Sequence, residues 1–470
     1  MLLLDREAEL ARLDDLTCTP DGGLAVLSGR RRVGKTRILT EWAKRSSGLY
    51  TVADQSAPEI QRAYFAESVA ARIPGFADVS YPDWRVLLRS LSTQAKALGW
   101  RGPIIFDELP YLAAASPELP SVLQSWLDHE AKAAKLVVAI AGSSQRMMQG
   151  LVLSAEAPLF GRARVMLSIE PLDTPWLARA FPGSSGIGLI EAYTVWGGIP
   201  RYWELAAAER GSQRSRVERI VLDPLGPLHR EPDRILLEEV PSAVELRPVL
   251  DAIGSGAHRV SEIAGRIGRP ATSMSRPLAR LVEMGLVARE IPFGESERKS
   301  KRALYKIADP FFRLWFRVVA PHRGFLQSAA RADRLALLER FWTALSSAAW
   351  EDVCRRRLPR LGSRSALARR GPWGPASRWW HGNRPEWDLV SLSAAGGRLL
   401  LGEVKWSDRP CSRSMLERES RRLATKELPH VSQSLDGVEI VRVLFVPARA
   451  KGAPSKCNGV LVVDAAAVMR

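Results

Sequence analysis

The sequence is poor in cysteine and contains no long hydrophobic run. Its 470 residues include four cysteines whose scattered positions show no metal-type spacing: Cys18, Cys354, Cys411 and Cys457. We therefore expect a reducing cytoplasm and no structural zinc site. No apolar segment approaches the length that crosses a bilayer, and the leucines after Met1 are too few for the core of a signal peptide. The sequence thus predicts a cytoplasmic protein without a membrane partner.

What the sequence does contain is a globular composition and an uneven excess of positive charge. Hydrophobic residues make up 46% and charged residues 25%, which excludes intrinsic disorder, and the length suggests about three domains. From Phe311 onward, 28 Lys and Arg face 14 Asp and Glu, so this segment holds +14 of the net charge of +17. Such a basic segment favours a polyanionic partner such as nucleic acid. The alternative is an arginine-rich protein without such a partner.

The first functional signal is a phosphate-binding loop. A short apolar strand at 24–29 leads into GRRRVGKT, which matches the pattern G-x-x-x-x-G-K-[ST] in full and continues into a helix expected from Lys35 to Lys44. Glycines let backbone N–H groups face phosphate oxygens, and the helix adds its positive end. We expect Lys35 to bind the β- and γ-phosphates of ATP and the Thr36 hydroxyl to bind Mg²⁺. The predicted nucleotide-binding residues of this loop are Gly29, Arg30, Arg31, Arg32, Val33, Gly34, Lys35, Thr36 and Arg37.

Two later segments add groups that ATP hydrolysis requires. GPIIFDELPYL is an apolar strand that ends in Asp107, expected to hold Mg²⁺, usually through water, and Glu108, expected to polarise the attacking water. KLVVAIAGSS is a further strand, and it ends in Ser143 and Ser144 where a residue contacting the γ-phosphate would lie. The alternative for this serine pair is that it caps the next helix.

Five segments in this order resemble the archaeal-type ATPases of the AAA+/STAND group over residues 3–205: SGRRRVGKT, FDELPYL, AGSS, APLFGR and WGGIPRYWEL. The resemblance implies a nucleotide domain followed by a helical lid. It makes Arg162 a candidate for completing the nucleotide site, including that of a neighbouring subunit in an assembly of several copies. It also makes Gly198, Ile199 and Pro200 the lid motif that touches the nucleotide. Taken alone, Arg162 could instead form a structural ion pair, and the glycine-proline turn could simply end a helix.

The middle of the chain has the pattern of a winged helix. Three helical segments at 246–256, 260–268 and 271–290 precede a strand, a charged loop and a second strand. In the third helix the side chains expected inside are Met274, Leu278, Leu281 and Val282, and those expected outside are Ser273, Ser275, Arg276 and Arg280. The wing tip carries Arg298, Lys299, Lys301 and Arg302. DNA contact is one interpretation, and a docking domain with a solvated charged loop is the other.

The last third contains an apolar hairpin with charged residues at one end. WDLVSLSAAGGRLLLGEVKW predicts two strands, in which Glu403 and Lys405 share a face. If the loop is Ala395-Gly396, Asp388 pairs with Glu403, and if it is Gly396-Gly397, Asp388 faces Lys405. Two carboxylates held side by side repel each other, so a cation or a reaction is expected to use them.

The order of a helix, this hairpin and further strands, with D…ExK, resembles the PD-(D/E)XK nuclease-like fold. DPFFRLWFRVVAP with RWW, EWDLV and LLLGEVKW is similar to the uncharacterised C-terminal domain commonly fused to archaeal-type ATPases. The resemblance implies that Asp388 and Glu403 hold Mg²⁺ at a phosphodiester and that Lys405 steadies the attacking water, with Glu351 as a helix-borne addition. An inactive descendant of this fold is the alternative.

The sequence therefore predicts an α/β protein of four parts. They are a P-loop ATPase core with a parallel sheet at 1–165, a helical lid at 166–240, a winged helix at 241–310 and an α/β restriction-endonuclease-like domain at 311–470. The expected cofactors are ATP and Mg²⁺, and DNA is the favoured polyanion. One hypothesis is an ATPase coupled to a Mg²⁺-dependent nuclease. The other is an ATP-switched DNA- or protein-binding regulator with an inactive nuclease fold, and a nucleotide-gated toxin-like or defence switch is compatible with the same motifs.

Overall fold

A computed structural model describes residues 4–239, 243–297, 300, 302–362, 365–430 and 437–469. The described chain divides into two compact units. The first comprises residues up to Leu172 together with Ile199–Arg201, and the second comprises Asp173–Gly198 and the residues from Tyr202 onward. Among the described residues, no helix combines the length and the apolar character needed to cross a membrane.

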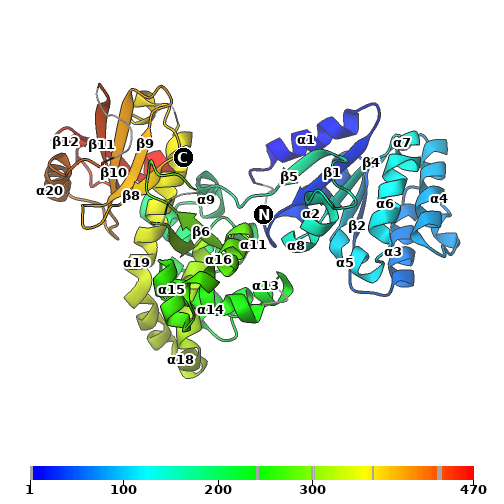
Figure 1. Ribbon diagram of the computed structural model, residues 1–470, viewed down its shortest axis with the longest axis horizontal. Coiled ribbons are helices and arrows are strands. Elements are labelled where there is room, and N and C mark those ends of the chain that lie inside the picture. Colours follow the sequence, from blue (N-terminus) through cyan, green and yellow to red (C-terminus); the bar gives the residue numbers. More distant parts are fainter. Residues whose placement is uncertain are drawn as a thin grey trace. The chain divides into compact units, whose positions relative to one another are not determined.

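The first unit is built on a five-stranded sheet in the order β2-β3-β4-β1-β5, and every neighbouring pair is parallel (Figure 1). Its central strands are buried on both faces, which explains their continuous apolar sequences. The strands are β1 Gly23–Ser28, β2 Leu49–Val52, β3 Ile104–Asp107, β4 Val137–Ala141 and β5 Ala163–Ser168. The sheet extends beyond the predicted boundary at 165, because β5 is one of its strands.

Helices cover this sheet through regularly spaced apolar residues. One core cluster joins Phe106 and Ile140 of the sheet to Phe65 of α3, Leu88 of α4 and Leu123 of α6. The α-helices of the unit are α1 Glu7–Cys18, α2 Lys35–Arg45, α3 Pro58–Ala70, α4 Trp84–Ala97, α5 Leu109–Ala115, α6 Leu119–Asp128, α7 Glu130–Ala133 and α8 Gln145–Met148. The predicted helix after the phosphate-binding loop is confirmed as α2.

The second unit begins with short helices around an aromatic core. Phe311, Phe312, Trp315 and Phe316 are fully buried, as expected for the run that contains them. The α-helices in this part are α9 Leu177–Ala180, α10 Gly186–Trp196, α11 Pro200–Ala208, whose first two residues lie in the first unit, α12 Gln213–Val217, α13 Glu231–Glu239, α17 Pro310–Leu314 and α18 Arg323–Ser328.

Three helices and a two-stranded hairpin follow α13. They are α14 Ala243–Gly254, α15 Val260–Ile267, α16 Ser275–Glu283, β6 Val287–Glu290 and β7 Leu304–Ile307. A 3₁₀ turn at Ala271–Met274 precedes α16, so the third predicted helix is shorter than expected. The first strand also begins earlier than expected.

The C-terminal part of the second unit is a six-stranded sheet in the order β12-β13-β11-β10-β9-β8, drawn in orange to brown in Figure 1. The long helix α19, Arg331–Arg357, precedes it, and α20, Arg413–Ala424, connects β10 to the parallel strand β11. The strands are β8 Ser377–Trp379, β9 Trp387–Leu392, β10 Arg398–Val404, β11 Glu439–Val446, β12 Lys456–Cys457 and β13 Val460–Asp464, and α21 spans Ala465–Val468.

The helical segment and the C-terminal sheet form one compact unit, although they are predicted as separate domains. Phe293 N–H, after β6, donates to the carbonyl of Arg378 in β8 at 2.7 Å, and Lys306 of β7 binds Asp352 of α19. These contacts cross the predicted boundary at 310 and place the β6–β7 hairpin against the C-terminal part of the unit.

Candidate nucleotide site and acidic site

The phosphate-binding loop lies at the carboxyl edge of the first sheet, between β1 and α2. Its backbone has positive φ at Gly29, Arg32 and Gly34, a conformation that favours glycine and that arginine adopts only where surrounding structure holds it. The Lys35 ammonium donates to the carbonyls of Gly29 at 2.7 Å and Arg30 at 3.1 Å, so it lies within the curl of the loop. The loop thus has the geometry expected of a phosphate cradle.

Adjacent strands bring the predicted metal and catalytic groups to the same edge. The Thr36 hydroxyl donates to Asp107 Oδ2 at 2.7 Å, and Asp107 is buried at the end of β3. Hydroxyl and carboxylate oxygens are hard donors of the kind that Mg²⁺ prefers, so these two residues fit the ion. Glu108 follows with φ 55°, and its Oε2 accepts from the Ser143 N–H and hydroxyl, both at 3.0 Å.

Ser143, which follows β4, contacts the carboxylate of Glu108. Strand β4 lies between β1 and β3, so the residues after it face both the loop and the acidic pair. Ser143 holds the Glu108 carboxylate, whereas the Ser144 hydroxyl accepts from Met147 N–H at 3.4 Å, a long contact in the first turn of the next helix. Ser144 therefore caps the next helix, and Ser143 binds the Glu108 carboxylate. Contact of Ser143 with the γ-phosphate stays a prediction.

Two residues of this site carry no motif signal in the sequence. The Tyr50 hydroxyl, on β2, donates to Asp107 Oδ2 at 2.8 Å, and burial together with Asp107 raises the pKa of Tyr50. The buried Arg6 donates to the carbonyls of Val33 at 3.2 Å and Glu170 at 2.7 Å. Arg6 therefore ties the loop to the segment after β5.

Arg162 does not lie in the nucleotide site of its own chain. It precedes β5, at the amino edge of the parallel sheet, opposite the edge that carries the loop. Its guanidinium binds both oxygens of Asp128, at 2.9 and 2.8 Å. Within its own chain Arg162 thus forms the structural ion pair that was the alternative expectation. A role in a neighbouring subunit stays a prediction.

The lid motif lies partly beside the loop. Gly197 ends α10 with φ 52°, and Pro200 begins α11. Ile199 and Pro200 belong to the first unit, and a Cβ added at Gly34 would come within 4.0 Å of the Pro200 ring. Pro200 is thus positioned next to the phosphate-binding loop.

In the helical segment, the buried and exposed faces of α16 and of the 3₁₀ turn before it follow the prediction closely. Met274, Leu278 and Leu281 are buried, whereas Val282 is only half-buried. Ser273, Ser275 and Arg276 are exposed, and Arg280 is half-buried. Arg302 pairs with Glu295 at 2.5 Å, and the predicted tip residues Arg298, Lys299 and Lys301 lie outside the described residues.

The hairpin β9–β10 adopts the first of the two expected registers. Gly402 pairs with Leu389, so the next pair is Glu403 and Asp388. The Val404 N–H donates to Asp388 Oδ2 at 2.9 Å. Burial and the neighbouring Glu403 raise the pKa of Asp388. The two carboxylates therefore lie side by side at the end of the hairpin.

Two lysines neutralise Glu403. Lys405 binds its Oε1 at 2.8 Å, and Lys426, just after α20, binds its Oε2 at 2.6 Å. Although burial works against ionisation, these lysines hold the pKa of Glu403 below its usual value. Within the described residues, no group of three or more His, Cys, Asp and Glu side chains is arranged to hold a metal ion. Binding of Mg²⁺ by Asp388 and Glu403 stays a prediction. Lys426 is a residue of this site that no sequence motif marks.

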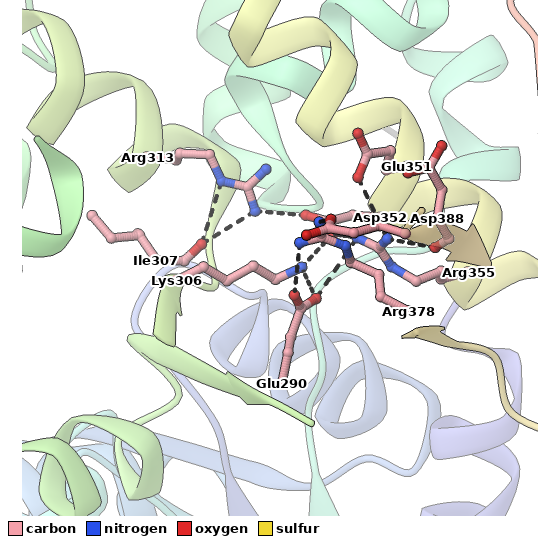
Figure 2. Close-up of polar contacts among 10 residues, drawn as sticks. Glu290, Lys306, Ile307, Arg313, Glu351, Asp352, Arg355, Arg378 and Asp388 are labelled. Atoms are coloured by element: carbon pink, nitrogen blue, oxygen red, sulfur yellow. Dashed lines mark hydrogen bonds and ion pairs between the residues drawn. The ribbon is translucent and has the colours of Figure 1, made fainter. Parts of the chain in front are cut away.

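Glu351 of α19 lies near Asp388, as the helix-borne addition would. Burial, and then the charge of Asp388, raise the pKa of Glu351 to about 7. Arg355, one turn further along α19, donates to the Asp388 carbonyl at 2.9 Å and lies 3.5 Å from Glu351. Figure 2 shows these three residues together.

Arg355 also belongs to a largely buried ion network that joins α19 to the β6–β7 hairpin (Figure 2). Asp352 binds Lys306, Arg313 and Arg355, and Lys306 also pairs with Glu290. Burial alone would raise the pKa of Asp352, but the three cations hold it well below its usual value. The ion pairs of this network thus connect the β6–β7 hairpin to α19. The hydrogen bond of Arg355 to the Asp388 carbonyl extends the connection to β9.

The raised pKa of Glu351 predicts a pH-dependent stability. In the unfolded chain this carboxyl ionises near 4.5, whereas in the folded chain it keeps its proton up to about pH 7. The folded state therefore binds more protons in this window, and stability falls as the pH rises from about 4.5 to about 7. We expect Glu351→Gln to raise the free energy of unfolding at pH 8 by up to about 3 kcal/mol, and to have little effect at pH 4.

Thermal or urea unfolding of both proteins at several pH values measures this difference. Asp333→Asn, at an exposed position near the beginning of the same helix, is the control, and its effect is expected to be small at every pH. A Glu351→Gln protein that is less stable than wild type at pH 8 would contradict the assignment.

Comparisons with known proteins agree with the fold and the loop of the first unit, which are those of a P-loop ATPase. A family model described as an ATPase domain predominantly from Archaea matches residues 3–205. A second model, described as archaeal and bacterial proteins of unknown function, matches residues 315–423. Residues 3–205 are therefore similar to archaeal-type ATPase domains, and residues 315–423 are similar to a segment of proteins of unknown function.

The chain is also similar to individual proteins. The uncharacterized protein MJECL04 of Methanocaldococcus jannaschii is 27% identical over 408 residues, covering 87% of this chain and 88% of that protein. The Walker-type ATPase PABY2304 of Pyrococcus abyssi is 20% identical with a TM-score of 0.52, covering 67% of this chain and 96% of that one. This likeness shows a shared fold. Cdc6p from Pyrobaculum aerophilum is 14% identical with a TM-score of 0.34, covering 72% of this chain and 95% of that one.

Proposed function

We propose that the first unit binds ATP together with Mg²⁺ and hydrolyses it, and that nucleotide occupancy switches the arrangement of a nucleic-acid-binding second unit. One observation carries this proposal. Lys35 and Thr36, which follow the positive-φ loop, lie at the same sheet edge as Asp107 and Glu108. The convergence supports phosphoryl transfer to water, because such chemistry depends mainly on positioning and on stabilising phosphate charge.

Each residue has a role that follows from its contacts. Lys35 exchanges its bonds to loop carbonyls for phosphate oxygens, and Thr36 and Asp107 hold the metal. Bound Mg²⁺ supplies charge neutralisation at the phosphates. Glu108, held by Ser143, orients the attacking water. The raised pKa of Tyr50 keeps its hydroxyl protonated, so it donates to Asp107 and fixes that carboxylate.

Removing the loop lysine tests the binding step. We expect Lys35→Ala to weaken Mg·ATP binding by at least tenfold, because a charge-assisted contact with phosphate is lost. Isothermal titration of the full chain measures the affinity. Lys44→Ala, at an exposed position near the end of the same helix α2, is expected to bind ATP as the wild type does. A Lys35→Ala protein that binds Mg·ATP with wild-type affinity would contradict the proposal that this loop binds ATP.

A second candidate function is Mg²⁺-dependent cleavage of nucleic acid in the C-terminal part. The side-by-side placement of Asp388 and Glu403, with Glu351 near Asp388, favours it. The pairing of both Glu403 oxygens with lysines favours the alternative, an ATP-switched binding protein with an inactive nuclease-like fold. In that alternative, the excess of basic residues after Phe311 binds phosphates, and binding weakens steeply with salt.

Incubation with plasmid, linear DNA and RNA distinguishes a nuclease from a binding protein with an inactive nuclease-like fold. The reactions contain Mg²⁺ or Mn²⁺, with and without ATP, beside Asp388→Ala and Lys35→Ala proteins. A nuclease predicts metal-dependent cutting that Asp388→Ala reduces by at least a hundredfold, and an ATP dependence would show that the first unit gates it. If no condition yields cutting while nucleic acid is retained at low salt, the inactive fold is the correct description.

A further inference from the structure

The second unit contains a cavity of about 260 Å³ that the proposed function does not use. It lies between α14, the β6–β7 hairpin and α19, and its walls differ in character. One part is apolar and includes Ile253, Phe341 and Leu345, and another part contains the ion network of Figure 2. A small volume with an apolar part and a few convergent charges is typical of a site for a ligand below drug size.

The charged part carries an excess of cations. Five basic side chains line the cavity against three carboxylates, and they are Lys306, Arg313, Arg317, Arg355 and Arg378 against Glu290, Glu351 and Asp352. A network that served stability alone would leave no charge uncompensated, because each unpaired ion in a poorly solvated place costs several kcal/mol. Arg378 is also paired outside the cavity, with Glu386 at 2.9 Å, so the positive charge left for an anionic occupant is that of Arg317.

One of the basic side chains has bonding capacity that the described residues do not use. The Arg317 guanidinium lies 5.6 Å from the centre of the Phe341 ring and 3.5 Å from the Gly254 carbonyl, and no described carboxylate lies within ion-pairing distance of it. An anionic group in the cavity would satisfy the donors of Arg317.

We propose that this cavity binds a small organic anion, with one carboxylate or phosphate monoester at Arg317 and an apolar body against Phe341 and Leu345. The proposal is independent of the ATPase and nuclease hypotheses. Arg355 lines the same cavity and donates to the Asp388 carbonyl, so an occupant lies one side chain away from the acidic site.

Matched fragments test the proposal on the full-length chain, with the first unit saturated by Mg·ADP so that the phosphate-binding loop is occupied. The probes are phenyl phosphate, benzoate, the neutral benzamide and inorganic phosphate, and ligand-observed NMR titration measures their affinities. We expect phenyl phosphate or benzoate to bind at least tenfold more tightly than benzamide, and phenyl phosphate to bind more tightly than inorganic phosphate. The tighter of the two organic anions identifies the acidic group.

Variants locate the binding. Arg317→Gln is expected to lower the affinity of the tighter anion about tenfold or more, whereas Arg340→Gln should leave it unchanged. Arg340 is the matched control, because it also approaches the Phe341 ring, at 5.9 Å, but does not line the cavity. If Arg317→Gln does not fold, Ala348→Leu narrows the cavity without removing a charge and should also weaken binding. Equal affinities for benzoate and benzamide, full affinity in these variants, or no binding of either organic anion would overturn the proposal.

Discussion

Replacing Glu108 with glutamine is expected to lower the rate of ATP hydrolysis by about a hundredfold or more while leaving ATP affinity close to the wild-type value. Glutamine keeps the size of the side chain and its capacity to accept from Ser143, but it cannot take a proton from the attacking water. Lys35 donates to loop carbonyls and Thr36 donates to Asp107, so phosphate and metal binding should persist. Steady-state phosphate release and a separate ATP titration measure the two effects.

The control for this prediction is Glu118→Gln, an exposed residue before α6, which should hydrolyse ATP at the wild-type rate. Ser143→Ala should give a smaller loss than Glu108→Gln, since it frees the carboxylate without removing it. An unchanged hydrolysis rate in Glu108→Gln would show that another group orients the water.

Replacing Asp352 with alanine is expected to lower the free energy of unfolding of the second unit by about 3–5 kcal/mol. The substitution leaves Lys306, Arg313 and Arg355 close together without the carboxylate that all three bind. Uncompensated charges in a largely buried place are among the most destabilising changes a single substitution can make. Urea unfolding followed by tryptophan fluorescence measures the change.

Asp333→Ala supplies the comparison, because Asp333 is exposed near the beginning of the same helix α19 and its loss should cost less than about 1 kcal/mol. A loss of similar size in both proteins would mean that the ion network does not hold the hairpin against α19. Asp352→Ala should also disturb the acidic site, since Arg355 connects Asp352 to the Asp388 carbonyl.

The elements of the nucleotide site could be predicted because each lies within a short stretch of sequence. The loop, the start of α2 and the acidic end of β3 are read from contiguous residues, and their meeting follows from the rule that parallel strands end at one sheet edge. The same rule predicts the position of Arg162. This residue precedes the strand ARVMLS, so it must lie at the opposite edge.

The missed residues depend on contacts between distant segments. Tyr50 is 57 positions from Asp107, and Lys426 is 23 positions from Glu403. No local pattern marks either residue, and only the sheet order and the path of α20 bring them to their partners. The register of the β9–β10 hairpin was limited to two alternatives by the turn sequence, and the pairing of Gly402 with Leu389 selects one of them.

The extent of the second unit was also beyond sequence reasoning. The strands and the long helix α19 follow from apolar periodicity, but the bonds of Glu290 and Lys306 to the ion network join the hairpin to the C-terminal sheet. Charged residues on short strands usually indicate solvent exposure, so no sequence pattern indicates burial here.

The most direct test of the central claim is the rate of Mg²⁺-dependent ATP hydrolysis by the purified full-length chain, measured beside Lys35→Ala with and without nucleic acid. The account predicts hydrolysis that requires Mg²⁺ and is lost in Lys35→Ala. A wild-type protein that hydrolyses no ATP under any of these conditions, or a Lys35→Ala protein with the wild-type rate, would contradict it.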